Sequence, residues 1–222
     1  SRGFPAVEDR QVHVHQDEIG PLRHRQAHAL LTVRRDQNLE APTLQTARLI
    51  LRPLALSDAP AIQRHFNNWN IIQHLAQVVP WPYPEDGAEI FITRELERVA
   101  AGEEIYNWML VLRGGDGEAI GNIRFRPGSD DAKGNRGFWL AERYWNQGLM
   151  REAVSAVNDF AFRTLGIESF HACNAATNVA SRRVKQKTGA ELVGYIELAH
   201  HSGQTLAERW RVTRENWLRR KP

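Results

Sequence analysis

The sequence predicts an α/β (α+β) fold, in which strands and helices alternate along the chain. An apolar strand over 138–141 leads into a helix near Glu152, and a short strand over 169–174 leads into a helix over 178–189. Glycine-containing turns indicate two strand pairs, around 114–117 and around 200–203. The predicted order is β-α-α-β-β-β-α-β-α-β-β, an alternation that is typical of helices packed on a sheet.

The first 42 residues differ from the rest, and we interpret 1–42 as an N-terminal extension of a domain over 43–222. The extension is rich in His, Arg, Gln and Asp. His13, His15, His24 and His28 are candidate metal ligands, but no cysteine and no third and fourth ligand pattern accompany them. The sequence favours a solvated segment: a tail, an arm on a partner subunit or a start-site artefact.

Next come one strand and two helices. The strand over 48–52 ends at Pro53, and Ser57 with Pro60 is typical of a helix start. This helix runs to about Asn67, and an aromatic, proline-rich loop follows over 69–84. The second helix ends at Gly102, and its apolar stripe consists of Ala88, Phe91, Ile92, Leu96 and Val99.

The second half contains most of the predicted strands. The segments 105–112 and 119–125 form a hairpin, and a polar turn over 128–135 precedes the strand at 138–141. The last two strands are expected at 191–199 and 207–212.

The turn at Gly148 is a candidate anion site. A strand that passes through a glycine turn into a helix presents free backbone N–H groups and the positive end of the helix dipole. These features suit a pyrophosphate, and a side chain at Gly148 would hold the phosphates away from the backbone. Many strand–turn–helix units bind nothing, so this segment alone leaves both interpretations open.

The helix over 178–189 is predicted to have two unlike faces. Ala180, Val184 and Thr188 share a small or apolar face that is expected to pack. The opposite face carries an amide, a hydroxyl and two cations, which suit a ligand with amide groups and phosphates: Asn178, Ser181, Arg182 and Lys185.

Together these segments resemble the GCN5-related N-acetyltransferase (GNAT) superfamily, in its RimJ/RimL-like branch of ribosomal-protein amino-terminal acetyltransferases. The first motif is Tyr144-Trp145-Asn146-Gln147-Gly148-Leu149-Met150-Arg151-Glu152-Ala153. The second comprises Asn178, Ser181, Val184, Lys187 and Gly189, and residues 44–54 are similar to the opening of the branch. The resemblance covers about 43–218. Asn146 and Gln147 replace the usual Gly and Lys, Met150 replaces a small residue, and Ala190 replaces Phe.

The resemblance implies a mixed, mostly antiparallel sheet of about seven strands with helices on both faces, and acetyl-CoA as acetyl donor. It implies that Leu140 and Ala141 pair with the pantetheine arm, and that the N–H groups of Gln147, Gly148, Leu149, Met150 and Arg151 bind the pyrophosphate. Asn174 and Asn178 are candidates for the pantetheine amides. Arg182, Arg183 and Lys185 are candidates for the 3′-phosphate. For each side chain the alternative is an ordinary cap, turn or solvated cation.

The resemblance also implies two catalytic groups. The N–H of Leu140 supports the developing oxyanion, and Ser181 hydrogen-bonds or protonates the departing thiolate. The base stays open among Glu142, Glu103, Glu104, His74, His171 and a water chain, because an α-amino group with a pKa of about 7.7–8.0 has a useful neutral fraction without help. Trp69, Trp81, Tyr83 and Trp108 are expected to line the acceptor pocket, with ordinary core packing as the alternative.

Composition narrows the function further. The formal charge is +3 and the pI is about 9.3, with acidic and basic residues interspersed, so a nucleic-acid partner is not expected. One cysteine, Cys173, fits a reducing cytoplasm, and no apolar run indicates a membrane span or a secretory signal. No metal is expected, and a homodimer is an open alternative. The resemblance implies direct acetyl transfer to a protein N-terminus or a small amine, with a non-catalytic acyl-CoA-binding module as the alternative.

Overall fold

The computed structural model describes residues 40–128 and 134–220, which belong to one compact unit. The candidate histidines of the extension and the centre of the polar turn expected at 128–135 lie outside the described residues.

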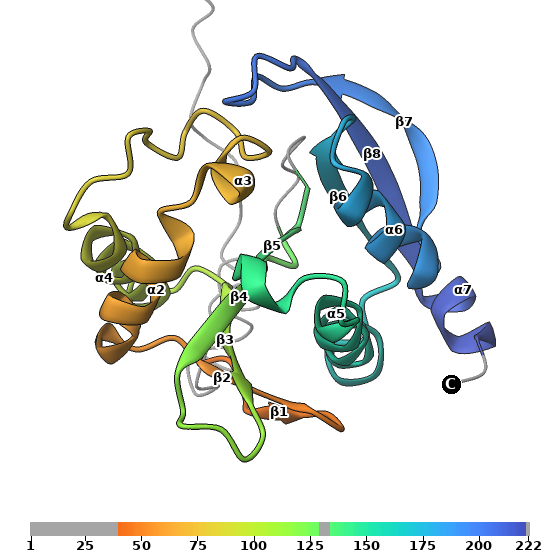
Figure 1. The fold of residues 1–222 in the computed structure, drawn as a ribbon. Coiled ribbons are helices and arrows are strands. Elements are labelled where there is room, and N and C mark those ends of the chain that lie inside the picture. The colour runs from red at the N-terminus through yellow and green to blue at the C-terminus, as the bar shows by residue number, and fades with distance from the viewer. Residues whose placement is uncertain (1–39, 129–133, 221–222) are drawn as a thin grey trace, which may run out of the picture. The chain divides into compact units, whose positions relative to one another are not determined.

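One eight-stranded sheet forms the centre of this unit, in the order β1-β2-β3-β4-β5-β6-β8-β7 (Figure 1). The strands are β1 (Leu44–Gln45), β2 (Leu49–Pro53), β3 (Tyr106–Leu112), β4 (Ala119–Phe125), β5 (Arg136–Leu140), β6 (Ser169–Ala175), β7 (Glu191–Glu197) and β8 (Leu206–Thr213). All neighbours are antiparallel except β5 and β6, which are parallel. The mixed, mostly antiparallel sheet is confirmed, and the two-residue β1 makes the eighth strand.

Helices cover both faces of the sheet, as predicted (Figure 1). They are α2 (Ala59–Phe66), α3 (Trp69–Ile72), α4 (Gly87–Ala100), α5 (Leu149–Asp159), α6 (Val179–Lys187) and α7 (Arg214–Arg219). Because successive strand residues point to opposite faces, β3 serves two cores. Met109 belongs to the core under α2 and α4, and Leu110 belongs to the core under α5.

Two helices were not predicted. α3 forms at the start of the aromatic segment that the sequence suggested as a loop, because the Asn68 side chain accepts the Asn70 N–H at 2.9 Å and caps the helix. α7 follows β8 directly, and the indole N–H of Trp217 donates to Asp159 at 2.9 Å. This contact ties the C-terminal helix to the end of α5.

The parallel pair opens into a fork, and this feature organises the site. β5 and β6 share the single register pair Arg136–Ala172, beside a hydrogen bond of 2.7 Å from Asn135 N–H to His171 O. Beyond it β5 stays paired with β4, and β6 stays paired with β8. Within the described residues, the facing edges of 137–140 and 173–175 are therefore not paired with each other. We call this opening the strand fork.

The packed domain begins slightly before the predicted boundary at residue 43. Ala41 is buried, and the carbonyl oxygen of Pro42 accepts the indole N–H of Trp108 at 2.6 Å. Of the residues that we interpret as the extension, Ala41 is therefore part of the core, and the exposed Pro42 contributes its carbonyl oxygen.

Among the described residues, no helix is long and apolar enough to cross a membrane. In the same part of the chain, His, Cys, Asp and Glu side chains form no group of three that could hold a metal ion.

Candidate active site

The fork is bordered by a strand end whose backbone N–H is turned into it. Ala141 N–H donates to Ile120 O at 2.8 Å, and the register pairs Leu140 with Gly121. In an antiparallel ladder this pattern makes Leu140 and Gly121 a non-hydrogen-bonded pair. The Leu140 N–H therefore points away from β4 and toward the fork, whereas the Ala141 N–H is already bonded inside the sheet.

The turn after β5 leads into the N-terminus of α5 through two left-handed residues. Asn146 has a φ of 60° and Gly148 a φ of 78°, a region that glycine adopts without strain. The first backbone bond of the helix runs from Glu152 N–H to Gly148 O at 3.1 Å. The N–H groups just before it are the ones that a helix cannot satisfy itself. The Met150 side chain is buried in the core, so it does not cover these N–H groups.

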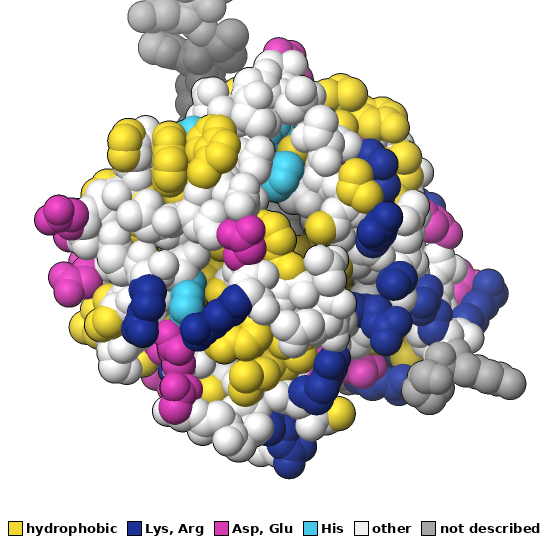
Figure 2. Space-filling model, viewed as in Figure 1, with side chains coloured by type: hydrophobic (Ala, Val, Ile, Leu, Met, Phe, Trp, Pro, Cys, Tyr) yellow, Lys and Arg dark blue, Asp and Glu magenta, His cyan; other side chains and the backbone are white. Residues whose placement is uncertain are grey.

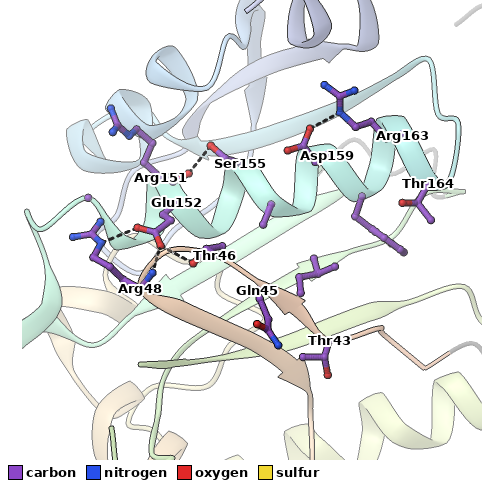
Figure 3. A pocket seen from close by; sticks show the side chains of 14 residues that line it. Thr43, Gln45, Thr46, Arg48, Arg151, Glu152, Ser155, Asp159, Arg163 and Thr164 are labelled. Carbon is purple, nitrogen blue, oxygen red and sulfur yellow. Dashed lines mark hydrogen bonds and ion pairs between the residues drawn. The ribbon is translucent and has the colours of Figure 1, made fainter. Parts of the chain in front are cut away.

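A polar cluster fixes the position of this turn. Glu152 accepts hydrogen bonds from Thr46 Oγ1 at 2.6 Å and from the backbone and side chain of Arg48 at 2.7 and 2.8 Å (Figure 3). Arg48 also donates to Gln147 O at 2.9 Å. Burial favours a raised pKa at Glu152, but these donors and the charge of Arg48 more than offset it, so the pKa lies below its usual range. The start of α5 is therefore locked to the β1–β2 turn.

An open groove of about 650 Å³ lies beside this cluster, between β1 and α5, and does not coincide with the fork (Figure 3). Four of its five charged side chains pair with one another, Arg48 with Glu152 at 2.8 Å and Arg163 with Asp159 at 2.9 Å, and the fifth is Arg151 at the start of α5. Apart from Gly148 and Arg151 at the turn before α5, we do not assign the lining of the groove to the reaction.

Asn174 and Arg182 are held by one buried carboxylate on the β6 side of the fork. Glu208 accepts Asn174 Nδ2 at 2.9 Å and Arg182 Nε at 2.7 Å. Burial alone raises the pKa of Glu208, but the hydrogen bonds from Arg182 and Asn174 bring it below its usual range. Arg182 also donates to Ala176 O at 2.6 Å, so its guanidinium is bound within the protein. The buried Oδ1 of Asn174 accepts no hydrogen bond from any of the described residues.

Helix α6 packs through Val184 and Thr188, as predicted, but also through Ser181 and Lys185, which the sequence pattern placed on the ligand face. Ser181, Lys185 and Thr188 are buried, whereas Ala180 is exposed. The expected packing of Ala180, Val184 and Thr188 is therefore wrong in part. Polar side chains can be buried when they hydrogen-bond one another: Lys185 Nζ donates to Ser181 Oγ at 2.7 Å, and Thr188 Oγ1 donates to Val184 O at 2.9 Å. Asn178 caps the helix, because its Oδ1 accepts Ser181 N–H at 2.9 Å.

Lys185 lies inside the protein instead of on the surface where a 3′-phosphate was expected to meet it. Its side chain is 1% exposed, and Nζ lies 5.4 Å from the centroid of the Phe138 ring on β5. Burial, and then the charge of Arg136, lower the pKa of Lys185 to about 7. Arg136 is itself buried, bonded to Asn158, and burial lowers its pKa to about 9. The exposed cations of α5 and α6, which a phosphate could reach, are Arg151, Arg183 and Lys187.

The aromatic residues expected at the acceptor pocket separate into surface and core positions. Trp81 is 39% exposed and lies against Trp69, with ring centroids 5.2 Å apart. Tyr83 is buried against Phe66, and burial raises its pKa to about 12. Trp108 is fully buried in the core under α5, so a substrate could not reach it without opening the sheet.

The aromatic segment also forms hydrogen bonds with the β7–β8 turn. This contact places His74 near His200, a neighbour that the sequence did not indicate. Ser202 N–H donates to Gln73 O at 3.0 Å, and Gln77 N–H donates to Ala199 O at 3.1 Å. His200 is buried with Nδ1 3.1 Å from Gln204 O. Burial of the His74 ring, and then its electrostatic interaction with His200, lower the pKa of His74. The sequence indicates His74 as a base candidate, whereas it indicates His200 only as part of a turn.

On the face of the molecule seen in Figure 2, a hollow lies near the centre, and hydrophobic and histidine side chains are visible in and around it. Lys and Arg side chains gather on the side of α5 and α6.

Two of the acidic residues that were candidates for the general base are already bound to other side chains. Glu142 accepts Asn68 and Asn70 amides at 2.7 and 2.9 Å, and Glu103 pairs with Arg98 at 2.5 Å.

The sequence of this domain matches a known family. Residues 48–191 match the acetyltransferase (GNAT) domain family, which is more than half of the chain. The chain therefore belongs to the GNAT acetyltransferase family, and the predicted membership is confirmed.

Individual proteins are similar to this chain in sequence or in fold. The uncharacterized N-acetyltransferase YnaD of Bacillus subtilis is 23% identical over 154 residues, 69% of this chain and 85% of the relative. The fold is similar to that of a ribosomal-protein-S5-alanine acetyltransferase from Vibrio fischeri (TM-score 0.66, 18% identity, 82% of this chain and 100% of the other). It is also similar to that of Mycobacterium smegmatis RimJ in complex with a CoA disulfide (TM-score 0.65, 18% identity, 75% and 82%).

Proposed function

We propose that this protein transfers the acetyl group of acetyl-CoA directly to a primary amine, within a ternary complex and without an acyl-enzyme. The observation that carries the proposal is the strand fork, where the Leu140 N–H points into the gap and Ser181 lies at the start of α6. The structures of similar fold include complexes with CoA, such as that of Mycobacterium smegmatis RimJ.

The described residues fit a CoA thioester along the fork. The unpaired edge of β5 offers backbone groups to the pantetheine amides, and the buried, unpartnered Oδ1 of Asn174 is a further acceptor. The N–H groups from Gly148 to Arg151 suit the pyrophosphate, because the helix leaves them unbonded and Met150 is turned into the core. For the 3′-phosphate we favour exposed Arg183, because Arg182 is bound to Glu208 and Lys185 is buried.

The chemistry follows from two protein donors. As the amine nitrogen attacks the thioester carbon, the Leu140 N–H stabilises the negative charge that forms on the carbonyl oxygen. When the C–S bond breaks, the Ser181 hydroxyl donates to the leaving sulfur, and the proton of the attacking amine passes to water. The products are an acetylated amine and free CoA.

The acceptor is a protein N-terminus or a small amine. An α-amino group is neutral in useful amount near pH 8, so it can attack without a strong base. The exposed Trp69–Trp81 pair offers an apolar wall for the residue that carries the amine. A peptide N-terminus is the acceptor that we would test first.

Calorimetric titration with acetyl-CoA, CoA and dephospho-CoA tests the donor site, followed by transfer to a panel of peptides and small amines. We expect acetyl-CoA to bind at micromolar concentrations, and dephospho-CoA to bind more weakly. The absence of CoA binding would overturn the proposal, and binding without turnover on any amine would favour the acyl-CoA-binding module.

Ser181→Ala tests the leaving-group contact. We expect kcat to fall about 10²-fold, in the range of a lost acid–base contact, with the Kd for acetyl-CoA within about twofold of the unmodified protein. Ser155→Ala is the matched control, because that hydroxyl bonds Arg151 O on the exposed side of α5. Unchanged kcat in Ser181→Ala would remove this residue from the mechanism.

A further inference from the structure

Lys185 is unusual because lysine is almost never fully buried without a partner that compensates for the lost hydration. Only 1% of its surface is exposed, and it lies one helical turn after Ser181 on the same face of α6. Its Nζ donates to Ser181 Oγ at 2.7 Å. A core position that holds an ammonium against one particular hydroxyl is costly for stability, so the contact calls for a functional explanation.

The direction of this hydrogen bond matters. Because an ammonium is only a donor, the Ser181 oxygen must accept, and the hydroxyl hydrogen is left to point elsewhere. The Asn178 side chain fixes the backbone of Ser181 at the helix start, at 2.9 Å. The serine is therefore held at two points, with its hydrogen available to a third group.

The ammonium lies at the fork itself. Its Nζ is 5.4 Å from the ring centroid of Phe138, which belongs to the unpaired edge of β5. Three ionisable side chains act on it: Arg136 on β5, Cys173 on β6 and Glu208 on β8. Glu208 forms an ion pair with Arg182 at 2.6 Å, so the charge of Arg182 largely compensates that of Glu208.

We propose that Lys185 is the proton source behind Ser181: its ammonium orients the serine hydroxyl toward the leaving sulfur and replaces the proton that the hydroxyl donates. Lys185 acts through Ser181 and is thus a positioning residue. This inference rests on the proposed acetyl transfer, and it replaces the expected role of Lys185 as a ligand of the 3′-phosphate.

The proton balance of the step closes. When the C–S bond breaks, its electron pair stays on sulfur, Ser181 Oγ–H gives its proton to that sulfur, and Lys185 Nζ–H gives a proton to Oγ. Serine ends unchanged, lysine ends as the neutral amine, and solvent returns one proton to it after CoA leaves. Since burial and Arg136 lower the pKa of Lys185 to about 7, transfer toward a thiolate whose thiol has a pKa of about 8.5 is favourable.

The first test needs no acceptor amine. CoA is bound to the protein, and the ionisation of its thiol is followed by the ultraviolet absorbance of the thiolate. The complex with desulfo-CoA serves as the blank, because it shows the absorbance that Cys173 contributes. The thiolate of bound CoA and the Lys185 ammonium stabilise each other, so the thiol begins to ionise at lower pH when Lys185 is present, and we expect Lys185→Met to raise the pKa of the bound thiol. Lys187→Met, an exposed position on the same helix, is the control and leaves it unchanged.

The second test is the pH dependence of kcat. In the unmodified protein kcat falls on the alkaline side as Lys185 loses its proton, whereas Lys185→Met lacks this limb and is about tenfold slower or more at neutral pH. The Kd for CoA stays within about twofold of the unmodified protein, which a phosphate ligand would not allow. In a Cys173→Ser background, aminoethylation of Lys185→Cys restores a side-chain ammonium and brings the alkaline limb back.

The outcomes separate this inference from the proposed function. No CoA binding by the unmodified protein would overturn both. Normal CoA binding and turnover, with the thiol pKa and the alkaline limb unchanged in Lys185→Met, would overturn the role of Lys185 alone. A large loss of affinity for CoA but not for dephospho-CoA would return Lys185 to the 3′-phosphate.

Discussion

At the scale of single residues, Lys185 makes the stability of the protein depend on pH. Its pKa is about 7 in the fold and 10.5 ordinarily. Between these values the unfolded chain binds more protons than the folded one, so the contribution of Lys185 to stability rises with pH. Below pH 7 the full cost of a buried charge applies.

Lys185→Met removes this dependence. Between pH 7 and pH 9, we expect the free energy of unfolding of the unmodified protein to gain about 2 kcal/mol relative to Lys185→Met, since one proton corresponds to about 1.4 kcal/mol per pH unit. Urea denaturation at both pH values measures the difference. A difference that does not change with pH would mean that the folded lysine titrates normally.

The same residue shows where sequence reasoning reached its limit. Helical spacing correctly grouped Ser181 and Lys185 on one face, because that grouping depends only on geometry. It assigned that face to a ligand surface, since polar side chains are usually exposed. Burial of the pair depends on partners from β5, β6 and β8, which lie far away in the sequence.

At the scale of secondary-structure elements, close pairing of β4 with β5 supports the edge of the fork. A Cβ at Gly121 would lie 2.6 Å from Trp139 O and 3.0 Å from Leu140 Cδ1. Backbone atoms cannot move aside cheaply within a sheet, so Gly121 is required for the approach that orients Leu140.

We expect Gly121→Ala to lower the free energy of unfolding by about 1–3 kcal/mol, which is typical of an overpacked site. Gly137→Ala is the matched control in the neighbouring strand, because its Cβ would meet no atom within 4 Å. Thermal denaturation of the two variants should show a clear loss for Gly121→Ala only. Equal melting temperatures would mean that the strands separate easily at this point.

Most elements could be predicted, because hydrophobic periodicity and glycine turns act locally. The hairpin around 114–117, the strand and helix on either side of Gly148, and the helix start at Asn178 all depend on neighbours in sequence. α3 was missed because its four residues depend on one Asn68 cap, and β1 was missed because it exists only through its pairing with β2.

At the scale of the whole molecule, the described sheet has two parts that meet at one register pair. The strands β1 to β5 are continuously paired on one side, and β6, β8 and β7 on the other. The order of the strands could be expected only through the family resemblance, because long-range pairing leaves little trace in local pattern. A pantetheine arm in the fork would supply hydrogen bonds where the two parts diverge.

The start of the packed domain tests how far the core extends along the chain. Ala41 is buried, and Pro42 O is the acceptor of the Trp108 indole N–H at 2.6 Å. A chain that begins at residue 43 lacks both groups, whereas a chain that begins at residue 40 keeps them. Without this carbonyl the fully buried indole N–H loses its partner, which costs about 1–3 kcal/mol.

We therefore expect the 43–222 chain to unfold at lower urea concentration than the 40–222 chain. Repeating the comparison with Trp108→Phe in both chains isolates the hydrogen bond, because phenylalanine has no N–H to leave unbonded. The difference between the two chains should then shrink to the part that comes from burying Ala41. If the difference is equally large with phenylalanine, the loss of apolar contacts, and not the Pro42 carbonyl, explains the lower stability, and residues 41–42 act as packing alone.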